Sequence, residues 1–258
     1  MKQLLLRGEP LGKIKGIIFD KDGTLVNSEE YLLKLAQIRI DEALNIYKKE
    51  KKNENQILEL EILLNNAYGI SNECLNPNLL MAIDSRENNL ISTATIFCLV
   101  GENWPRALDI ANKVFISSDR IYKEKATNYR NALILPGAKQ LLNKLNKNGL
   151  KIGLMSNDSI KGIDYFLAYN NIQNIFQIFW GSENYPKKPN PEALIAYCKL
   201  LKIDPSECAL ASDSDTDLRM GKKSNVRTCL GYSAGWSSPP LLYEHHHLIK
   251  HWNELDIQ

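Results

Sequence analysis

The sequence lacks the features that mark several large classes of protein. None of its 258 residues lies in an apolar run long enough to cross a bilayer. The formal net charge is only +2, because 32 Lys and Arg nearly balance 30 Asp and Glu, so no charge excess that would attract nucleic acid or membranes is present. A hydrophobic content of 44% and a charged content of 24% are typical of a folded globular protein, not of a disordered or fibrous one. We therefore predict no nucleic-acid partner and no membrane association.

Cysteine is sparse and scattered. The five cysteines are Cys74, Cys98, Cys198, Cys208 and Cys229. None forms a C-x-x-C pair, which argues against zinc or dithiol chemistry, and the odd number argues against a disulfide framework. The segment Met1–Pro10 contains only the apolar run Leu4–Leu6, which is too short for the core of a signal peptide. We expect a reducing, cytoplasmic location.

The chain begins with a short apolar segment and continues into a long helical one. Within residues 14–20 the run K-G-I-I-F-D predicts a buried strand, because it is apolar and bounded by turn residues. From about Glu29 to Arg130, apolar residues recur at helical spacing and few alternating β-branched runs appear. This pattern predicts a bundle of helices with breaks near Gly69, Asn76-Pro77 and Gly101.

Helices and strands alternate from Leu135 onward. We expect helices over Ala138–Lys147, Ile160–Tyr169, Pro191–Leu201 and Asp217–Lys223. We expect strands over Lys151–Met155, Ile175–Trp180, Cys208–Ala211 and Val226–Leu230. This alternation predicts an α/β fold, in which helices cover both faces of a parallel sheet. The first strand belongs to the same sheet by type, although about a hundred residues separate it from the rest, far more than a loop needs. The middle helices are therefore interpreted as an insertion that forms a separate lid.

The sharpest chemical signal is F-D-K-D-G-T-L at Phe19–Leu25, directly after the first predicted strand. Sites in open α/β sheets lie outside the carboxyl ends of the strands. Asp20 and Asp22 can both point into such a site if Gly23 permits a sharp turn. Such a pair suits phosphoryl transfer, in which one carboxylate attacks phosphorus and the other moves the proton. The competing interpretation is a surface Asx-turn, which the position after an apolar strand disfavours.

A second acidic cluster, Ala211–Asp217, follows another predicted strand. Its oxygen ligands suit magnesium, which is usually held by one or two carboxylates and substrate phosphate. A calcium loop of the EF-hand type is excluded, because Leu218 stands where that loop needs Gly and Ser224 where it needs Glu. Capping of the following helix accounts for Asp215 but not for three acids at one strand end.

Two smaller signals lie between the acidic clusters. Met155–Asp158 follows a strand, so the Ser156 hydroxyl and nearby N–H groups can hold a phosphoryl oxygen, although a helix cap is the commoner role of such residues. Pro186–Pro191 places a lysine in a stiff turn before a helix. A lysine there can neutralise a phosphoryl transition state, and its ordinary alternative is a solvated loop.

Together these segments resemble the haloacid dehalogenase superfamily, and more narrowly its phosphoglycolate-phosphatase-like members, from Lys15 to about Tyr232. The resemblance implies a Rossmann-like core with an all-helical cap inserted after the first motif. The implied domains are residues 1–27 with 131–258 for the core, and 28–130 for the cap.

The same resemblance implies roles for individual residues. Asp20 is similar to the family nucleophile and Asp22 to its acid and base. Asp213 matches the Mg²⁺ ligand, joined by the Asp20 carboxylate and the Asp22 carbonyl. The remaining implied residues are Ser156, Asn157 and Lys188 for substrate phosphate, with Lys187 as the other register for the lysine, and Thr24 and Asp217 in support.

Three positions depart from the family pattern. Ser212 replaces a usual glycine, Asn27 a common aspartate, and Lys187 a frequent glycine. None of these changes removes a catalytic group, but they limit the transfer of a substrate from relatives. Asp22 also argues against dehalogenation, which needs no acid for the leaving group.

Other residues that invite a functional interpretation are assigned ordinary roles. Consecutive side chains in His245–His247 point in different directions and rarely converge on one ion, and His251 lies nearby. Arg86 could reach a substrate carboxylate from the cap, although most such arginines are surface residues. Trp104 and Trp236 are interpreted as packing or loop-anchoring residues.

The resulting expectation is a Mg²⁺-dependent phosphatase that acts on a small phosphorylated metabolite, of the phosphoglycolate or sugar-phosphate type, through a phosphoaspartyl intermediate. The alternatives are a phosphomutase of the same fold and a non-catalytic binding module, which would lack an essential acid or lysine. We expect a monomer or a homodimer.

Overall fold

The computed structural model describes residues 1–125 and 133–258. The chain divides into two compact units, Met1–Ser28 with Asn131–Gln258, and Glu29–Arg130. The predicted domain boundary between residues 130 and 131 lies outside the described residues.

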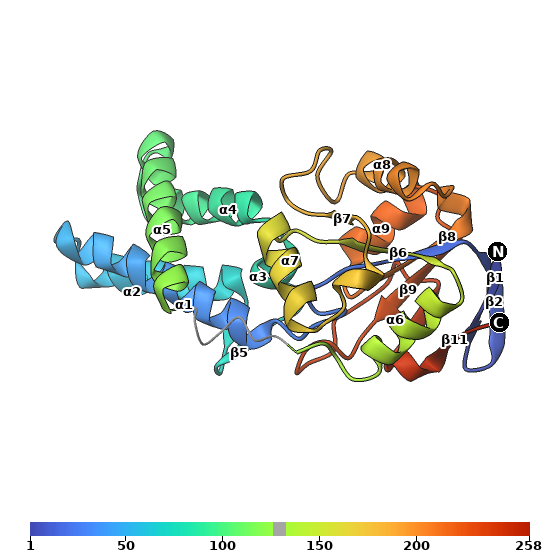
Figure 1. Cartoon of the computed structure of the whole chain (residues 1–258). Coiled ribbons are helices and arrows are strands. Elements are labelled where there is room, and N and C mark those ends of the chain that lie inside the picture. The colour runs from blue at the N-terminus through green and yellow to red at the C-terminus, as the bar shows by residue number, and fades with distance from the viewer. Residues whose placement is uncertain (126–132) are drawn as a thin grey trace. The chain divides into compact units, whose positions relative to one another are not determined.

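The first unit is built on one six-stranded parallel sheet in the order β10-β9-β8-β3-β6-β7 (Figure 1). The strands are β3 (Gly16–Phe19), β6 (Lys151–Met155), β7 (Phe179–Trp180), β8 (Cys208–Ser212), β9 (Thr228–Tyr232) and β10 (His247–Ile249). β3 is central and pairs with β6 on one side and β8 on the other. The predicted α/β class with a parallel sheet is confirmed.

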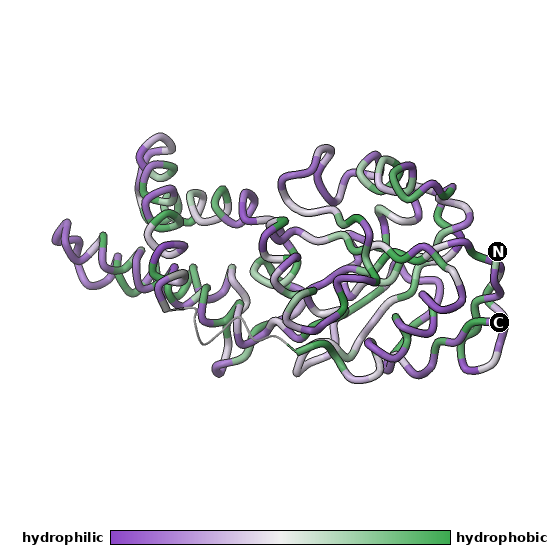
Figure 2. Tube along the Cα trace, viewed as in Figure 1, coloured by the Kyte–Doolittle hydropathy of each residue, from purple (hydrophilic) through white to green (hydrophobic). Residues whose placement is uncertain are grey.

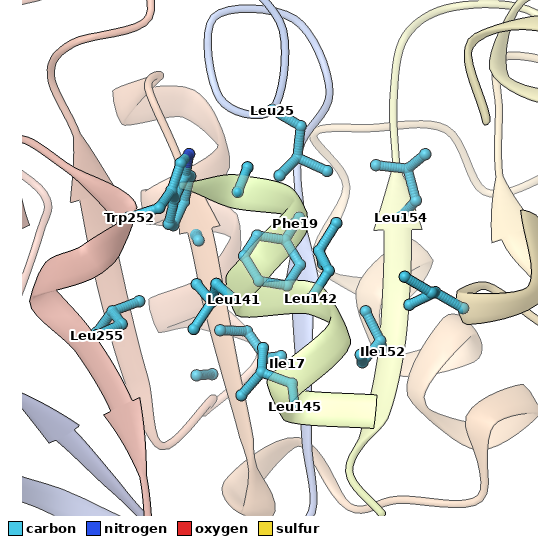
Figure 3. Close-up of a cluster of buried hydrophobic side chains, with 14 of the residues drawn as sticks. Ile17, Phe19, Leu25, Leu141, Leu142, Leu145, Ile152, Leu154, Trp252 and Leu255 are labelled. Carbon is cyan, nitrogen blue, oxygen red and sulfur yellow. The ribbon is translucent and has the colours of Figure 1, made fainter. Parts of the chain in front are cut away.

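Helices pack on both faces of this sheet. They are α6 (Ala138–Lys147), α7 (Ile160–Tyr169), α8 (Pro191–Leu201) and α9 (Asp215–Lys223). Alternate strand residues face opposite sides, so Ile17 and Phe19 pack in the cluster that contains α6, whereas Ile18 packs in the cluster that contains α8 and α9. Figure 3 shows the first of these clusters, with Leu141, Leu142 and Leu145 of α6 against the strands.

Both chain ends contribute to a second, antiparallel sheet that the sequence interpretation missed. Its strands are β1 (Lys2–Leu6), β2 (Glu9–Ile14) and β11 (Leu255–Ile257), in the order β11-β1-β2. The two ends of the chain lie side by side in Figure 1 because β1 pairs with β11. Leu4, Leu6 and Ile257 enter the same apolar cluster as β3, so the terminal strands enlarge the core.

The second unit is mainly helical. Its helices are α1 (Glu29–Lys49), α2 (Glu54–Tyr68), α3 (Leu80–Ile83), α4 (Arg86–Leu99) and α5 (Trp104–Lys125). Apolar and polar segments alternate along them in Figure 2, as expected for helices with one buried face. The predicted break at Gly69 is a left-handed C-cap with φ of 81°. A two-stranded hairpin, β4 (Ile70–Ser71) with β5 (Cys74–Leu75), follows it and was not predicted.

Two predicted strands begin later in the structure than the sequence indicated. The strand expected over Ile175–Trp180 is only Phe179–Trp180, because the 3₁₀ turn Gln173–Ile175 occupies its start. The strand expected from Val226 begins at Thr228, since Asn225 takes φ of 57° in a turn.

None of the helices in residues 1–125 and 133–258 has the length and hydropathy to span a bilayer.

Candidate active site

The sequence motifs converge at the carboxyl ends of three adjacent strands. Asp20 follows β3, Ser156 follows β6 and Asp213 follows β8. These strands are neighbours in the sheet and run parallel, so their ends open at one edge. This edge is where open α/β sheets place their ligands.

Lys188 joins two carboxylates at this edge. Its Nζ lies 2.6 Å from Asp20 Oδ1 and 2.6 Å from Asp217 Oδ2, and it donates to the Met155 carbonyl at 3.3 Å. Its side chain is only 3% exposed. Lys187, the other register for the lysine, is exposed. The geometry therefore favours Lys188 as the cation that faces Asp20.

Burial and neighbouring charges strongly perturb this cluster. Burial raises the pKa of Asp20 well above its ordinary value, Lys188 lowers it, and the charges of Asp217 and Asp213 raise it further. Burial alone would lower the pKa of Lys188, but the charges of Asp20 and Asp217 outweigh burial and raise it. The lysine therefore stays protonated at neutral pH and provides a fixed positive charge.

Asp213 is held by one hydrogen bond on each carboxylate oxygen. Thr24 Oγ1 donates to Oδ1 at 2.8 Å, and the indole N–H of Trp236 donates to Oδ2 at 2.6 Å. Burial raises the pKa of Asp213 to about 7, although both hydrogen bonds lower it. The donor role of Trp236 was missed, since the sequence interpretation assigned it to packing or loop anchoring.

Glycines make this packing possible. Gly23 has φ of 71°, and a Cβ there would overlap Asp213 Oδ2 and Trp236 Nε1. A Cβ on Gly235 would overlap the carbonyl of Gly23. The predicted turn at Gly23 is present, and it also brings the Asp213 carboxylate against the first motif.

Asp22 is half-buried and is held by two side chains. The Ser28 hydroxyl and the Lys21 ammonium both donate to its Oδ1, the latter at 2.9 Å. Lys21 Nζ also lies 3.0 Å from Asp158 Oδ2. Burial alone would lower the pKa of Lys21, but the charges of Asp22 and Asp158 raise it. The sequence interpretation assigned no role to Lys21 or Ser28.

The segment after β6 forms a tight turn at the same edge. The Ser156 hydroxyl accepts a hydrogen bond from the Asp158 N–H at 3.0 Å, and Asn157 is half-buried beside it. The cap of α7 is Ser159, whose hydroxyl accepts from the Gly162 N–H at 3.1 Å. Ser156 is therefore not the helix cap that its sequence context also permitted.

The residues of the acidic segment after β8 have different contacts. Ser214, not Asp215, caps α9, and the Asp215 carboxylate accepts the N–H groups of Tyr243 and Glu244. Ser212, which by the resemblance stands where glycine is usual, donates to Asp217 Oδ2 at 3.0 Å. This substitution therefore adds a hydrogen bond to the acid that pairs with Lys188.

Three of the remaining candidates have structural partners. The His246 ring accepts from the Cys229 N–H, and His251 caps a short 3₁₀ turn. Arg86 forms an exposed ion pair with Asp119 at 2.7 Å. Asn27, one of the three departures from the family pattern named above, is exposed.

The donor set suits a small hard cation. Asp20 and Asp213 are both buried, and each has a raised pKa, so a bound cation would relieve the cost of charging them. Within residues 1–125 and 133–258, no group of three His, Cys, Asp or Glu side chains has a metal-binding arrangement. Mg²⁺ is compatible with so few protein ligands, because it is usually bound by one or two carboxylates with phosphate and water oxygens.

Comparison with known proteins identifies the same family along most of the chain. The family model for haloacid dehalogenase-like hydrolases matches residues 14–225. This region begins before the first motif and includes the second acidic cluster and Lys188.

Two curated relatives illustrate the range of similarity. A phosphoglycolate phosphatase of Psychrobacter arcticus is 30% identical over 139 residues, which is 53% of this chain and 57% of that protein. The chain thus spans about half the length of that relative. A phosphoglycolate phosphatase of Salmonella choleraesuis is 25% identical over 251 residues, covering 92% of this chain and 91% of that protein.

A solved structure shares the fold. A protein of Haemophilus somnus described as a predicted phosphoglycolate phosphatase superposes with a TM-score of 0.63 at 18% identity. The match covers 93% of this chain and 96% of that one.

Proposed function

The chain belongs to the haloacid dehalogenase-like hydrolases, and from that premise we propose that it hydrolyses small phosphate monoesters with Asp20 as the nucleophile. The observation that carries the proposal is the buried cluster in which Lys188 faces the Asp20 carboxylate, 2.6 Å away. A buried lysine beside a nucleophile is suited to neutralise the oxygens of a transferring phosphoryl group. The curated phosphoglycolate phosphatases support a small phosphorylated acid as the substrate class.

In the first step, an oxygen of the Asp20 carboxylate attacks phosphorus and the bond from phosphorus to the ester oxygen breaks. The departing oxygen takes the electron pair of that bond and a proton from Asp22, so the alcohol leaves neutral. The products of this step are the alcohol, an aspartyl phosphate on Asp20 and the Asp22 carboxylate.

In the second step, the Asp22 carboxylate takes a proton from water as the water oxygen attacks phosphorus. The bond between phosphorus and the Asp20 oxygen breaks, and its electron pair returns to the carboxylate. Phosphate leaves, and Asp22 again carries its proton. Ser156 and Asn157 are proposed to hold the phosphoryl oxygens at the end of β6.

Mg²⁺ is the cofactor that this proposal implies. The residues that would hold it are Asp213, the Asp20 carboxylate and the Asp22 carbonyl, and it would neutralise phosphoryl charge. Thr24 and Trp236 would orient Asp213, and Asp217 would orient Lys188. We further propose that the unit Glu29–Arg130 is the cap that sets substrate specificity. A cytoplasmic location is proposed because all five cysteines are free thiols.

The test is phosphate release from a panel of phosphorylated metabolites with Mg²⁺, for the native chain and Asp20→Asn. Activity that is present in the native chain and lost in the variant supports the proposal. Equal activity in both would exclude Asp20 as the nucleophile. Transfer of phosphate to a second sugar phosphate, in place of release, would show a phosphomutase instead.

A further inference from the structure

Lys21 lies between the two catalytic aspartates in the sequence, and its ammonium joins two loops of the site. Its Nζ contacts Asp22 Oδ1 at 2.9 Å in the loop after β3, and Asp158 Oδ2 at 3.0 Å in the loop after β6. The Lys21 side chain is only 10% exposed, so this bridge is largely shielded from solvent. The aromatic ring of Phe166 in α7 lies under the ammonium, 5.9 Å from its centre.

The Asp158 carboxylate, at one end of the bridge, is fixed in position by its neighbours. Asp158 Oδ1 accepts the Ser159 N–H at 2.7 Å, which leaves Oδ2 directed at Lys21. Gly162, in the first turn of α7, lies directly against this carboxylate, and a Cβ there would overlap both of its oxygens. The Asp158 N–H donates to Ser156, so the bridge also leads to the proposed phosphate-binding turn.

The Asp22 end of the bridge constrains one oxygen only. Lys21 and Ser28 both donate to Oδ1. No hydrogen bond from a described residue to Oδ2 is present, so that oxygen is the one available for exchange of a proton with substrate. A carboxylate anchored through one oxygen has a defined plane, and proton transfer depends on such alignment.

We propose that Lys21 is a positioning residue, which holds the Asp22 carboxylate in place for proton transfer by anchoring it to Asp158. This inference rests on the proposed phosphatase function. It adds that Lys21 affects the reaction through Asp22. It also adds that Lys21 connects Asp22, through Asp158, to the turn at Ser156 that is proposed to bind phosphate.

Substrates with different leaving groups can distinguish a positioning role of Lys21 from a general structural role. An alkoxide leaves poorly unless it is protonated, whereas p-nitrophenolate leaves readily without a proton. The value of kcat/KM reports only the steps up to release of the alcohol, so it isolates proton donation by Asp22. A misplaced Asp22 should therefore lower kcat/KM for an alkyl phosphate much more than for p-nitrophenyl phosphate.

The experiment compares Lys21→Met with the native chain on both esters in Mg²⁺. We expect kcat/KM for the alkyl phosphate to fall roughly 10- to 100-fold and that for p-nitrophenyl phosphate to fall less than about threefold. Asp158→Asn and Gly162→Ala should show the same selective loss, and Lys21→Arg should recover part of it. Lys15→Met is the matched control, since Lys15 forms an exposed ion pair with Glu207 and precedes β3, at the opposite end of that strand from these loops.

A double-mutant cycle tests the link to Asp22. If Lys21 acts through Asp22, then Lys21→Met should cause little further loss of kcat/KM in the Asp22→Asn background. Equal losses on the two esters, or additive losses in the cycle, would overturn the inference while leaving the phosphatase function intact. A native chain that cleaves neither ester would instead refute the proposed function, and this inference with it.

Discussion

Replacing Lys188 by Met should destabilise the protein in a pH-dependent way. Lys188 is the cation between the buried carboxylates of Asp20 and Asp217, at 2.6 Å from each. Removal of one partner from a buried ion pair typically costs about 3–5 kcal/mol, because the remaining charge stays buried. For a unit of this size, each kcal/mol shifts Tm by about 2–4 °C, so the expected fall is about 6–20 °C.

The sign of the pH dependence follows from the carboxylates. Burial already raises the pKa of Asp20, and loss of the lysine charge, which lowers it, would raise it further. A carboxyl group with a raised pKa in the folded state holds its proton more tightly there than in the unfolded state. The loss of stability relative to the native chain is therefore smallest at low pH, where Asp20 is protonated in both folded proteins, and it grows as pH rises through the raised pKa of Asp20.

Thermal unfolding followed by circular dichroism, in EDTA to exclude metal, measures this effect. Lys15→Met is the control, because the exposed pair Lys15–Glu207 should contribute less than about 1 kcal/mol. Adding Asp217→Asn to Lys188→Met should recover part of the loss. A Tm within 2 °C of the native value, or a loss that is the same at pH 5 and pH 8, would refute this reasoning.

Two further substitutions test the packing around Asp213. Gly23→Ala should lower kcat by about a hundredfold, because the new Cβ would overlap the Asp213 carboxylate and displace it; native-like kcat would contradict the role of this glycine. Trp236→Phe keeps an aromatic ring but removes the N–H that donates to Asp213 Oδ2, so Mg²⁺ affinity in calorimetry should fall about 10- to 100-fold. Trp104→Phe is its control, because that indole is exposed on the other unit, and equal affinities of both variants would count against a role for Trp236.

Local sequence signals were sufficient for four elements of the α/β core. The predicted bounds of α6, β6, α7 and α8 match those in the structure. These elements begin and end at strong local signals, such as Pro136-Gly137 before α6 and Pro191 at the start of α8. The strands at the chain ends were missed because they are short and because β1 pairs with β11 from the opposite end of the chain.

The positions of the site residues followed from topology, whereas their contacts did not. A motif at the end of each parallel strand predicts that Asp20, Ser156 and Asp213 meet at one edge of the sheet. The hydrogen bond from Trp236 to Asp213 and the bridge from Lys21 to Asp158 depend on tertiary packing. Neither residue has a local sequence pattern that distinguishes it from a core tryptophan or a surface lysine.

The most direct test of the central claim is to trap the phosphorylated enzyme. The native chain would be mixed with substrate and Mg²⁺, quenched in acid within milliseconds and digested for mass spectrometry. We predict a phosphoryl group on the peptide that contains Asp20, at a level that rises and then decays as substrate is consumed, and none in Asp20→Asn. Rapid phosphate release in which no acyl phosphate ever forms on that peptide would contradict the account.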